Sequence, residues 1–385
     1  MPEPFKNLFN AQIISGMGDH FLKAWPDFDR DHFVRAATNN LEMLELKARS
    51  EQITQALRKY LPEDYSHAGE IMLSSLTPED GSDLSNIPVN TKGISGWAVM
   101  PMAHYVGLWG MHDFKLSMML LKEMTIRSSS EFGIRFFLIE KQKETLAVLM
   151  EWTSDNNEHV RRLVSEGSRP RLPWAMRLSA FMENPEHILP LLEALKDDPS
   201  EYVRRSVANN LNDIAKDHPD RVAEIAEKWL RAASKNRQRL VRHACRSLIK
   251  QGHPATLKAL GYNPAKVKLE SLNLKTPTVN FGDALVFEMA LSSESTEDQA
   301  LIIDYIIHHK KANGRTTPKV FKWKVLTLSA GSTHRAKKKH PFKQITTRIY
   351  YPGLHKIEIV VNGAVQGGAE FELEIKGDQN SGSVF

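Results

Sequence analysis

An internal repeat constrains the fold of this chain more than any other feature. Residues 158–164 read EHVRRLV, residues 201–207 read EYVRRSV, and residues 239–245 read RLVRHAC as a weaker copy. Offsets of about 40 residues between successive copies, with a pair of helices in each copy, are typical of HEAT-type arrays. Such units bury one face against their neighbours and leave a curved surface free. The repeat therefore predicts a helical solenoid.

The apolar pattern divides the chain into two regions, and 385 residues favour two domains. Up to about residue 262, apolar residues recur at helical spacing, with examples at 33–46, 114–124 and 201–214. Beyond Gly261–Pro264, short apolar runs bounded by turn residues predict strands at 267–274, 284–291, 301–308, 320–326, 344–350, 355–361 and 369–375. Val361–Ala364 carries the Asn-Gly signal of a hairpin turn.

These patterns predict an α+β multidomain protein. Residues 1–262 would form an all-α HEAT-like helical repeat solenoid, which would be followed over residues 267–377 by a C-terminal immunoglobulin-like β-sandwich. We expect the sandwich to be an accessory DNA-binding domain, for the reasons of charge that follow.

The composition excludes several classes of protein. A single cysteine, Cys245, excludes a disulfide framework and a cysteine-based metal site, and it favours a reducing cytosol. The first residues do not have the pattern of a signal peptide, and no apolar run is long enough to cross a membrane. The histidines are scattered, without metal-ligand spacing. We expect a cytoplasmic protein of a bacterial-type cytosol that is associated with the nucleoid when it is bound to DNA. We also expect it to be a monomer and to need no metal and no cofactor.

Positive charge is concentrated in one stretch of the predicted sandwich. Between Lys310 and Lys343 the chain has eleven basic residues and no acid, in a protein whose net charge is +5. Such a run can be a set of solvated edges and loops, but its length and its lack of acids favour a surface that faces phosphates. The candidate DNA contacts in it are Lys322, Lys337, Lys338 and Lys339.

A helical wheel places charged residues of two neighbouring repeats on equivalent faces. With Val203 as reference, Val207, Leu211 and Ile214 lie on one side and form the inner face. The opposite side predicts an outward groove that combines cations with carboxylates and is lined by Arg162, Glu166, Arg205, Asn209 and Asp213.

Each candidate also has an ordinary structural interpretation. Arg162 and Glu166 can form a surface ion pair four residues apart, which contributes only tenths of a kcal/mol. Asp213 can be a solvated helix position. Glu131 can complete a capping box that begins at Ser128. Trp174 can be a core residue, although the stiff segment before it, 169–173, could hold an indole at the edge of a groove.

Three segments closely resemble AlkC-type DNA alkylation repair proteins, which are relatives of the AlkD glycosylases. They are residues 130–135 (SEFGIR), 158–174 (EHVRRLVSEGSRPRLPW) and 200–219 (SEYVRRSVANNLNDIAKDHP). The resemblance covers about the first 260 residues, and part of that family carries a C-terminal immunoglobulin-like domain. It implies a DNA glycosylase of base excision repair that removes cationic bases, chiefly 3-methyladenine and also 3-methylcytosine, from double-stranded DNA. It also implies excision without full extrusion of the base, unlike most enzymes that act on bases.

The resemblance implies a role for individual residues as well. Matching the motifs gives catalytic or lesion-contacting roles to Glu131, Glu166 and Asp213, and a contact with the lesion or the backbone to Trp174. AlkD-type relatives have an aromatic residue where this chain has Asn209, so this contact must be supplied differently here. Phosphates on either side of the lesion would be held by Arg162, Arg169, Arg171 and Arg205.

This residue set suits the chemistry of a cationic leaving group. An N3-alkylated adenine departs as a neutral base, so no strong general acid is required. Positive charge develops on the deoxyribose, where a fixed carboxylate stabilises it or orients the attacking water. A non-catalytic HEAT scaffold that binds DNA or a protein is the first alternative. A metal-dependent hydrolase is the second, although His308 and His309 would point to opposite faces of a strand.

Overall fold

The computed structural model describes residues 4–79, 89 and 92–375. Their contacts divide the chain into two compact units. The helical unit comprises residues up to 217 together with 234–244, and the β unit comprises residues 218–233 together with those from 245 onward. The described part of the helical unit contains helices and no β-strand, whereas the described part of the β unit contains three helices and eight strands.

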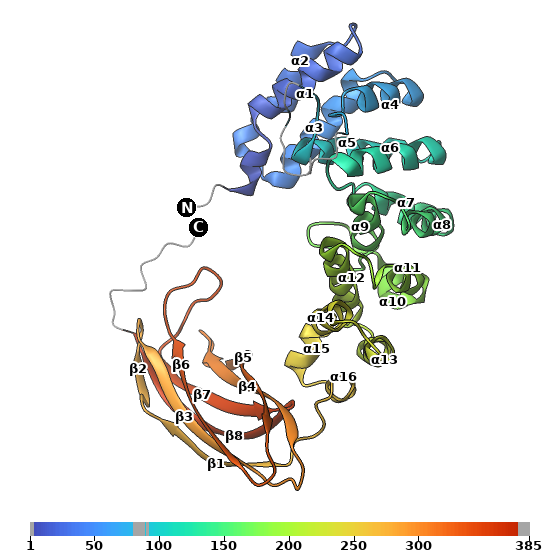
Figure 1. Ribbon diagram of the computed structural model, residues 1–385. Helices are drawn as coiled ribbons and strands as arrows, with labels where there is room; N and C mark the ends of the chain where they lie inside the picture. Colours follow the sequence, from blue (N-terminus) through green and yellow to red (C-terminus); the bar gives the residue numbers. More distant parts are fainter. Residues whose placement is uncertain (1–3, 80–88, 90–91, 376–385) are drawn as a thin grey trace. The chain divides into compact units, whose positions relative to one another are not determined.

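In the helical unit, short helices are stacked in chain order from α1 to α14 (Figure 1). The α-helices are α1 (Ala11–Ala24), α2 (Arg30–Thr38), α3 (Leu46–Tyr60), α4 (Tyr65–Ser74), α5 (Val99–Trp109), α6 (Phe114–Arg127), α7 (Ile134–Glu140), α8 (Gln142–Trp152), α9 (Glu158–Gly167), α10 (Ser179–Glu183), α11 (Leu189–Leu195), α12 (Glu201–Ile214) and α14 (Lys235–Ala244). Short 3₁₀ turns lie at Phe5–Leu8, Leu41–Met43, Gly96–Ala98 and Pro185–His187.

The sequence repeat corresponds to three neighbouring helices. Its copies lie on α9, α12 and α14, and α12 packs against both of the others. The predicted inner face of α12 is confirmed, because Val203, Val207, Leu211 and Ile214 are all buried. The helix expected over residues 33–46 is shorter than predicted. It ends at Thr38, and Asn40 then adopts a left-handed backbone that breaks the helical path.

The β unit is an immunoglobulin-like pair of sheets (Figure 1). Its helices are α13 (Pro219–Leu230), α15 (Arg246–Gln251) and α16 (Pro254–Ala259). The strands β1 (Val267–Leu274), β3 (Ala284–Ser293) and β6 (Thr333–Pro341) form one sheet in the order β1-β3-β6. The order in the second sheet is β2-β8-β7-β4-β5, with β2 (Thr278–Asn280), β4 (Gln299–Lys310), β5 (Thr316–Leu328), β7 (Gly353–Val361) and β8 (Ala364–Glu374). Apolar residues of both sheets, such as Phe287, Ile303 and Phe371, share one core.

Six of the seven predicted strands are present, and one prediction is wrong. Residues 344–350 form only an isolated bridge between Ile345 and Arg348, so their alternating apolar residues belong to a loop. The sequence pattern missed β2 and β6, and β6 escaped because its middle consists of Lys337, Lys338 and Lys339. The hairpin turn is confirmed, since Asn362 and Gly363 both have positive φ angles and Val361 pairs with Ala364.

The boundary between the two compact units differs from the predicted domain boundary at residues 262–267. The units group α13, α15 and α16 with the strands. One cause is a close approach of Gly252, after α15, to Gly363 in the β7–β8 turn. A Cβ atom on Gly252 would lie 2.8 Å from the Cα of Gly363. The division into 1–262 and 267–377 therefore remains a proposal, and residues 376 and 377 lie outside the described part.

Candidate active site

Glu166 lies in the last turn of α9 and is buried between two donors. Its Oε1 atom accepts a hydrogen bond from Nη1 of Arg169 at 2.7 Å. Its Oε2 atom accepts one from the hydroxyl of Ser206, on α12, at 2.6 Å. The carboxylate therefore joins its own helix, the following loop and the next repeat.

Asp213 lies in the last turn of α12 and binds the same arginine. Nε of Arg169 donates to Oδ2 of Asp213 at 2.8 Å, and Nζ of Lys216 donates to Oδ1 at 3.1 Å. Arg169 thus bridges the two carboxylates. The prediction that both lie on outward faces is wrong, and so is the interpretation of Asp213 as a solvated helix position, because only 5% of Glu166 and 2% of Asp213 are exposed. The helical wheel could not include Arg169, which comes from the loop and covers both.

Glu131 extends this arrangement from a third element. It lies in the turn before α7, where Oε2 accepts hydrogen bonds from Nη1 of Arg162 at 2.5 Å and from the hydroxyl of Ser129 at 2.7 Å. Nη2 of Arg162 lies 3.5 Å from Oε1 of Glu166. The capping-box interpretation is wrong, since Ser128 ends α6 and α7 begins only at Ile134. We call Glu131, Arg162, Glu166, Arg169 and Asp213 the ionic cluster.

The electrostatics of the ionic cluster keep Glu166 ionised. Burial would raise its pKa, but the nearby Arg162 and Arg169 guanidinium groups and the Ser206 hydrogen bond outweigh burial and lower it. Burial would likewise lower the pKa of Arg169, and its two carboxylate partners raise it instead. The surface-pair interpretation of Arg162 and Glu166 is therefore wrong, because their side chains are only 16% and 7% exposed.

The loop after α9 carries two further candidates. Trp174 is 52% exposed and has a φ angle of +66°, and its ring meets that of Phe5 edge to face at 6.0 Å. The core interpretation of Trp174 is therefore wrong, and the indole is available at the surface. Arg171 forms an ion pair with Asp217, in which Nη2 lies 2.7 Å from Oδ1.

A cavity of about 530 Å³ lies beside Glu131. Arg162 also lines it, with its guanidinium carbon 5.1 Å from the centre of the Tyr202 ring. Aromatic and carboxylate groups share its wall, since the lining includes Trp97, Phe132, Glu158, His159 and Tyr202. A planar, positively charged ligand suits such a wall, because the ring faces and the carboxylates both attract cations.

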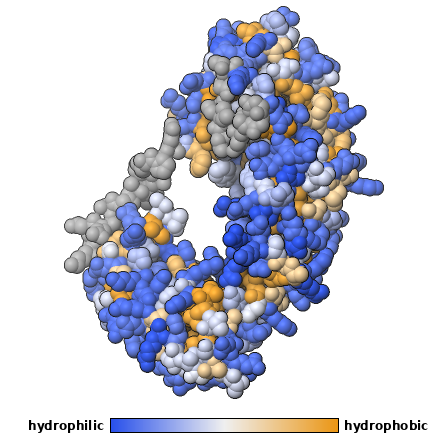
Figure 2. Space-filling model, in the orientation of Figure 1, coloured by the Kyte–Doolittle hydropathy of each residue, from blue (hydrophilic) through white to orange (hydrophobic). Residues whose placement is uncertain are grey.

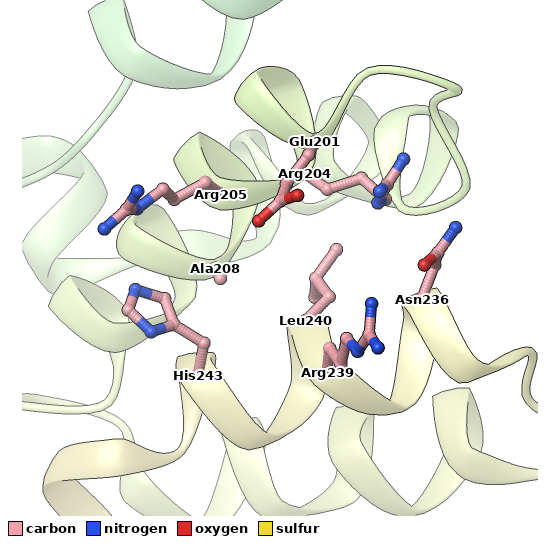
Figure 3. Close-up of a pocket in the computed structure, with 8 residues that line it drawn as sticks. All are labelled: Glu201, Arg204, Arg205, Ala208, Asn236, Arg239, Leu240 and His243. Carbon is pink, nitrogen blue, oxygen red and sulfur yellow. The ribbon is translucent and has the colours of Figure 1, made fainter.

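The equivalent groove one repeat further on is basic. It lies between α12 and α14 with a volume of about 310 Å³, and Figure 3 shows Glu201 and Leu240 near its middle with arginines around them. Arg205 and Arg239 are exposed, and neither has an ion pair or hydrogen bond with any residue that the structure describes. The predicted residue Asn209 is bonded to His243 beside the groove, with Oδ1 3.1 Å from Nε2. Hydrophilic residues dominate the surface over these helices (Figure 2).

The predicted lysines of the β unit lie on edge strands. Lys322 is exposed on β5, at the edge of the five-stranded sheet, and Lys337–Lys339 lie on β6, at the edge of the other sheet. Lys337 and Lys339 are exposed, and Lys338 points to the opposite face and is half-buried. Charged edge strands resist pairing with other chains and present cations to solvent.

The histidines do not form a metal site. His308 is bonded to Glu358 at 2.8 Å, whereas His309 points into the core, as expected for neighbours on a strand. Within residues 4–79, 89 and 92–375, no group of three or more histidine, cysteine or acidic side chains could hold a metal ion. No helix in those ranges is long and apolar enough to cross a membrane.

Three residues of this region were not found by sequence reasoning. Ser206 takes the repeat position that Leu163 has in the previous copy, which is a signal of a polar contact. Arg239 takes the position of Glu158 and Glu201, and this reversal of charge marks the basic groove. Arg135 ends the resembling segment 130–135, but no pattern gave it a role, and its contacts with the loop after α9 appear only in three dimensions.

Comparison with known proteins connects both units to one family. The family model for the DNA alkylation repair enzyme matches residues 124–251, and that for the C-terminal Ig-like domain of the uncharacterised protein YhaZ matches residues 268–375. The chain is 35% identical over 372 residues to uncharacterized protein YhaZ from Bacillus subtilis (strain 168), which covers 96% of this chain and 99% of YhaZ.

A solved structure matches over the same length. It is the alkylpurine DNA glycosylase AlkC from Pseudomonas fluorescens, bound to DNA containing an abasic site analog. The match has 37% identity and a TM-score of 0.85, and it covers 97% of this chain and 100% of AlkC. These matches span both the ionic cluster and the paired sheets, and they show that the chain belongs to the DNA alkylation repair enzyme family.

Proposed function

We propose that this chain is a DNA glycosylase that hydrolyses the N-glycosidic bond of cationic alkylated bases in double-stranded DNA. The observation that carries the proposal is the ionic cluster, in which Arg169 holds the buried Glu166 and Asp213 together and helps to keep Glu166 ionised. The similar AlkC is an alkylpurine DNA glycosylase bound to DNA with an abasic site analog. That bound state is what remains after a base has left.

The chemistry requires negative charge near the deoxyribose. A positively charged base leaves as a neutral molecule, and the sugar becomes oxocarbenium-like as the bond breaks. Carboxylates fixed in a site with little water stabilise this cation strongly, because they need no reorganisation during the reaction. Glu131 lines the cavity, so we assign it the direct approach to the sugar or the attacking water. Glu166 and Asp213 are buried, and we assign them the supporting field.

Discrimination follows from charge in this proposal. A cationic lesion gains energy from three carboxylates, and an undamaged neutral base does not. We propose 3-methyladenine as the main substrate and 3-methylcytosine as a further one. We also propose that the duplex is bent to expose the lesion without full extrusion, with the exposed indole of Trp174 contacting the lesion or the neighbouring backbone.

DNA phosphates would be held by both units. In the helical unit, Arg205 and Arg239 have no partner among the residues the structure describes, so both are available to a phosphate without breaking an existing bond. Arg162 and Arg169 are occupied by carboxylates, so we assign them to the catalytic site and no longer to phosphates. Arg171 would need to share its guanidinium with Asp217. In the β unit, the contacts would be Lys322 and Lys337–Lys339.

The test is a base-release assay on methylated duplex DNA in which the freed bases are identified. We expect 3-methyladenine to be released and Glu166→Gln, Asp213→Asn and Glu131→Gln each to lower the rate by about 10²–10³-fold. Glu144→Gln on α8 is the control, since this exposed carboxylate lies outside the ionic cluster. Release at the wild-type rate by all three variants would make the catalytic assignment wrong. Protein that binds the methylated duplex and releases no base would instead be the non-catalytic scaffold.

A further inference from the structure

Arg135 is a buried cation without an acidic partner. It lies on α7, its side chain is completely buried, and it has no ion pair with any carboxylate among the residues that the structure describes. Its bonds go to backbone carbonyl groups instead. Nη1 donates to the carbonyl oxygens of Gly167 and Arg169, each at 2.8 Å, and Nε donates to that of Met176, also at 2.8 Å. Nη2 donates to the Met176 carbonyl as well.

Burying such a cation is costly unless its donors are satisfied. Burial lowers the pKa of Arg135 to about 10, so the guanidinium keeps its charge at neutral pH. Three carbonyl dipoles compensate that charge. The planar guanidinium can donate in several fixed directions at once, which the single ammonium of a lysine cannot reproduce.

All three carbonyls belong to one segment, residues 167–176, which contains no helix or strand beyond Gly167. Between its two anchored ends lie the side chains on which the proposed function rests. In this segment, Arg169 donates hydrogen bonds to Glu166 and Asp213, and Trp174 has a left-handed backbone conformation. Few backbone hydrogen bonds fix the path of the segment from within, among them Ala175 N to Leu172 O at 3.3 Å.

We propose that Arg135 is a positioning residue for base excision, which holds residues 167–176 so that Arg169 lies between the two buried carboxylates and Trp174 faces the surface. This inference rests on the proposed function of the site. Arg135 touches neither DNA nor the reacting atoms in this role and acts through the segment it holds.

The role has a signature that loss of stability alone does not produce. The groups that face Glu166 are Arg162 on its own helix, Arg169 on the segment and the Ser206 hydroxyl on α12, and the charge of Arg135 on α7 acts on Glu166 as well. Arg135→Lys keeps that charge on α7, so in this variant only the position of Arg169 changes. When Arg169 moves away, burial of Glu166 is less compensated and its pKa rises. The acid side of the pH profile of base release should then move to higher pH.

The experiment compares Arg135→Lys and Arg135→Gln with a matched control, Arg49→Lys. Arg49 is also buried and donates to three carbonyls, those of Leu44, Lys6 and Phe9, at 2.9, 3.0 and 2.8 Å, but it has no contact with the ionic cluster. All variants are assayed at a temperature at which circular dichroism shows folded protein. We expect both Arg135 variants to lower kcat about 10²-fold and to shift the acid limb upward. We expect Arg49→Lys to change neither, and DNA affinity to stay within a few-fold throughout.

A double-mutant cycle with Arg169→Lys gives the decisive result. If Arg135 acts through Arg169, the double variant should be hardly slower than Arg169→Lys alone. Additive effects on kcat, or an acid limb that stays in place, would overturn the role of Arg135. Wild-type protein that releases no base would overturn the proposed function instead, so the two failures are distinguishable.

Discussion

The two units bury titratable side chains in opposite ways. In the helical unit, the ionic cluster buries charges, and each arginine lies against two carboxylates. In the β unit, the core buries His309, His340 and His355 among aromatic rings such as Phe342. Burial first, and then the nearby Arg348, lower the pKa of His309 to about 3 and that of His340 to about 4. His309 and His340 are therefore neutral at a pH at which Glu166 is ionised.

The helical unit therefore contains a buried site with charged side chains, whereas the β unit contains a buried core with neutral histidines. Paired buried charges contribute little net stability, because desolvation offsets their attraction, but they leave ionised groups in a dry site. Neutral buried histidines contribute packing and hydrogen bonds, such as the 2.9 Å contact between Tyr305 and His340. They create no field for catalysis. The ionic cluster is thus suited to chemistry, and the histidine core to holding two sheets together near neutral pH.

Removing one shared cation should have the largest effect on stability. Arg169→Met leaves Glu166 and Asp213 buried without their common partner, so we expect a loss of about 3–5 kcal/mol in the free energy of unfolding. The measurement is a denaturant titration followed by circular dichroism. Arg171→Met, in the same segment, is the control, because its pair with Asp217 is more exposed and should contribute no more than about 1 kcal/mol. Equal losses in the two variants would remove the distinction between a buried network and a surface pair.

Acid should affect the two regions in different pH windows, and this is the next largest effect. The pKa values of His309 and His340 in the folded protein lie below their ordinary value of 6.5, so the unfolded chain binds more protons between these limits. Stability of the β unit is complete above pH 6.5 and falls as the pH drops, by about 2 kcal/mol per histidine at pH 5. The pKa of Glu166 is also lowered, but from 4.5, so its contribution is lost only below that value.

Hydrogen exchange in the full chain separates these windows. Protection of β4 and β6, after correction for the intrinsic effect of pH, should fall between pH 7 and pH 5. Protection of α9 and α12 should hold through that range. Equal loss in both sets of peptides at pH 5 would mean that the histidine core does not control the acid response of the β unit.

The sequence predicted the elements that a periodic pattern can encode. The repeat placed three helices side by side, and six apolar runs placed six strands. The apolar pattern failed where the side chains of a segment do not reflect its backbone structure. Lys337–Lys339 hid an edge strand that pairs through its backbone, and the apolar residues around Ile345 imitated a strand in a loop. The spacing of apolar residues cannot distinguish these two segments, because hydrogen bonding between strand backbones does not depend on that spacing.

The sequence predicted which residues form the candidate site but not how their side chains are arranged. The wheel and the family resemblance together named every residue of the ionic cluster. Neither predicted that Arg169, from an irregular loop, would bury Glu166 and Asp213, or that Arg135 would hold that loop through its carbonyls. The contacts of Arg169 with Asp213 and of Arg135 with the loop join residues more than thirty positions apart, and no local pattern encodes the path of a loop between them.

The smallest predicted effects concern the affinity for DNA, and they test which unit contacts more of the DNA phosphates. Arg205→Ala and Arg239→Ala remove the unpartnered cations of the groove between α12 and α14, and Lys322→Ala and Lys339→Ala remove exposed cations of the edge strands. Removing a residue that contacts a phosphate should lower the slope of log Kd against the logarithm of the salt concentration by about 0.9. Fluorescence anisotropy on one undamaged duplex at several salt concentrations measures these slopes. Arg231→Ala is the control, because this exposed arginine is engaged by Glu227, 3.7 Å away on α13. If the slope changes only in the two lysine variants, the β unit contacts the DNA phosphates and the groove of the helical unit does not. If the slope is unchanged in all four variants, neither surface contacts phosphate.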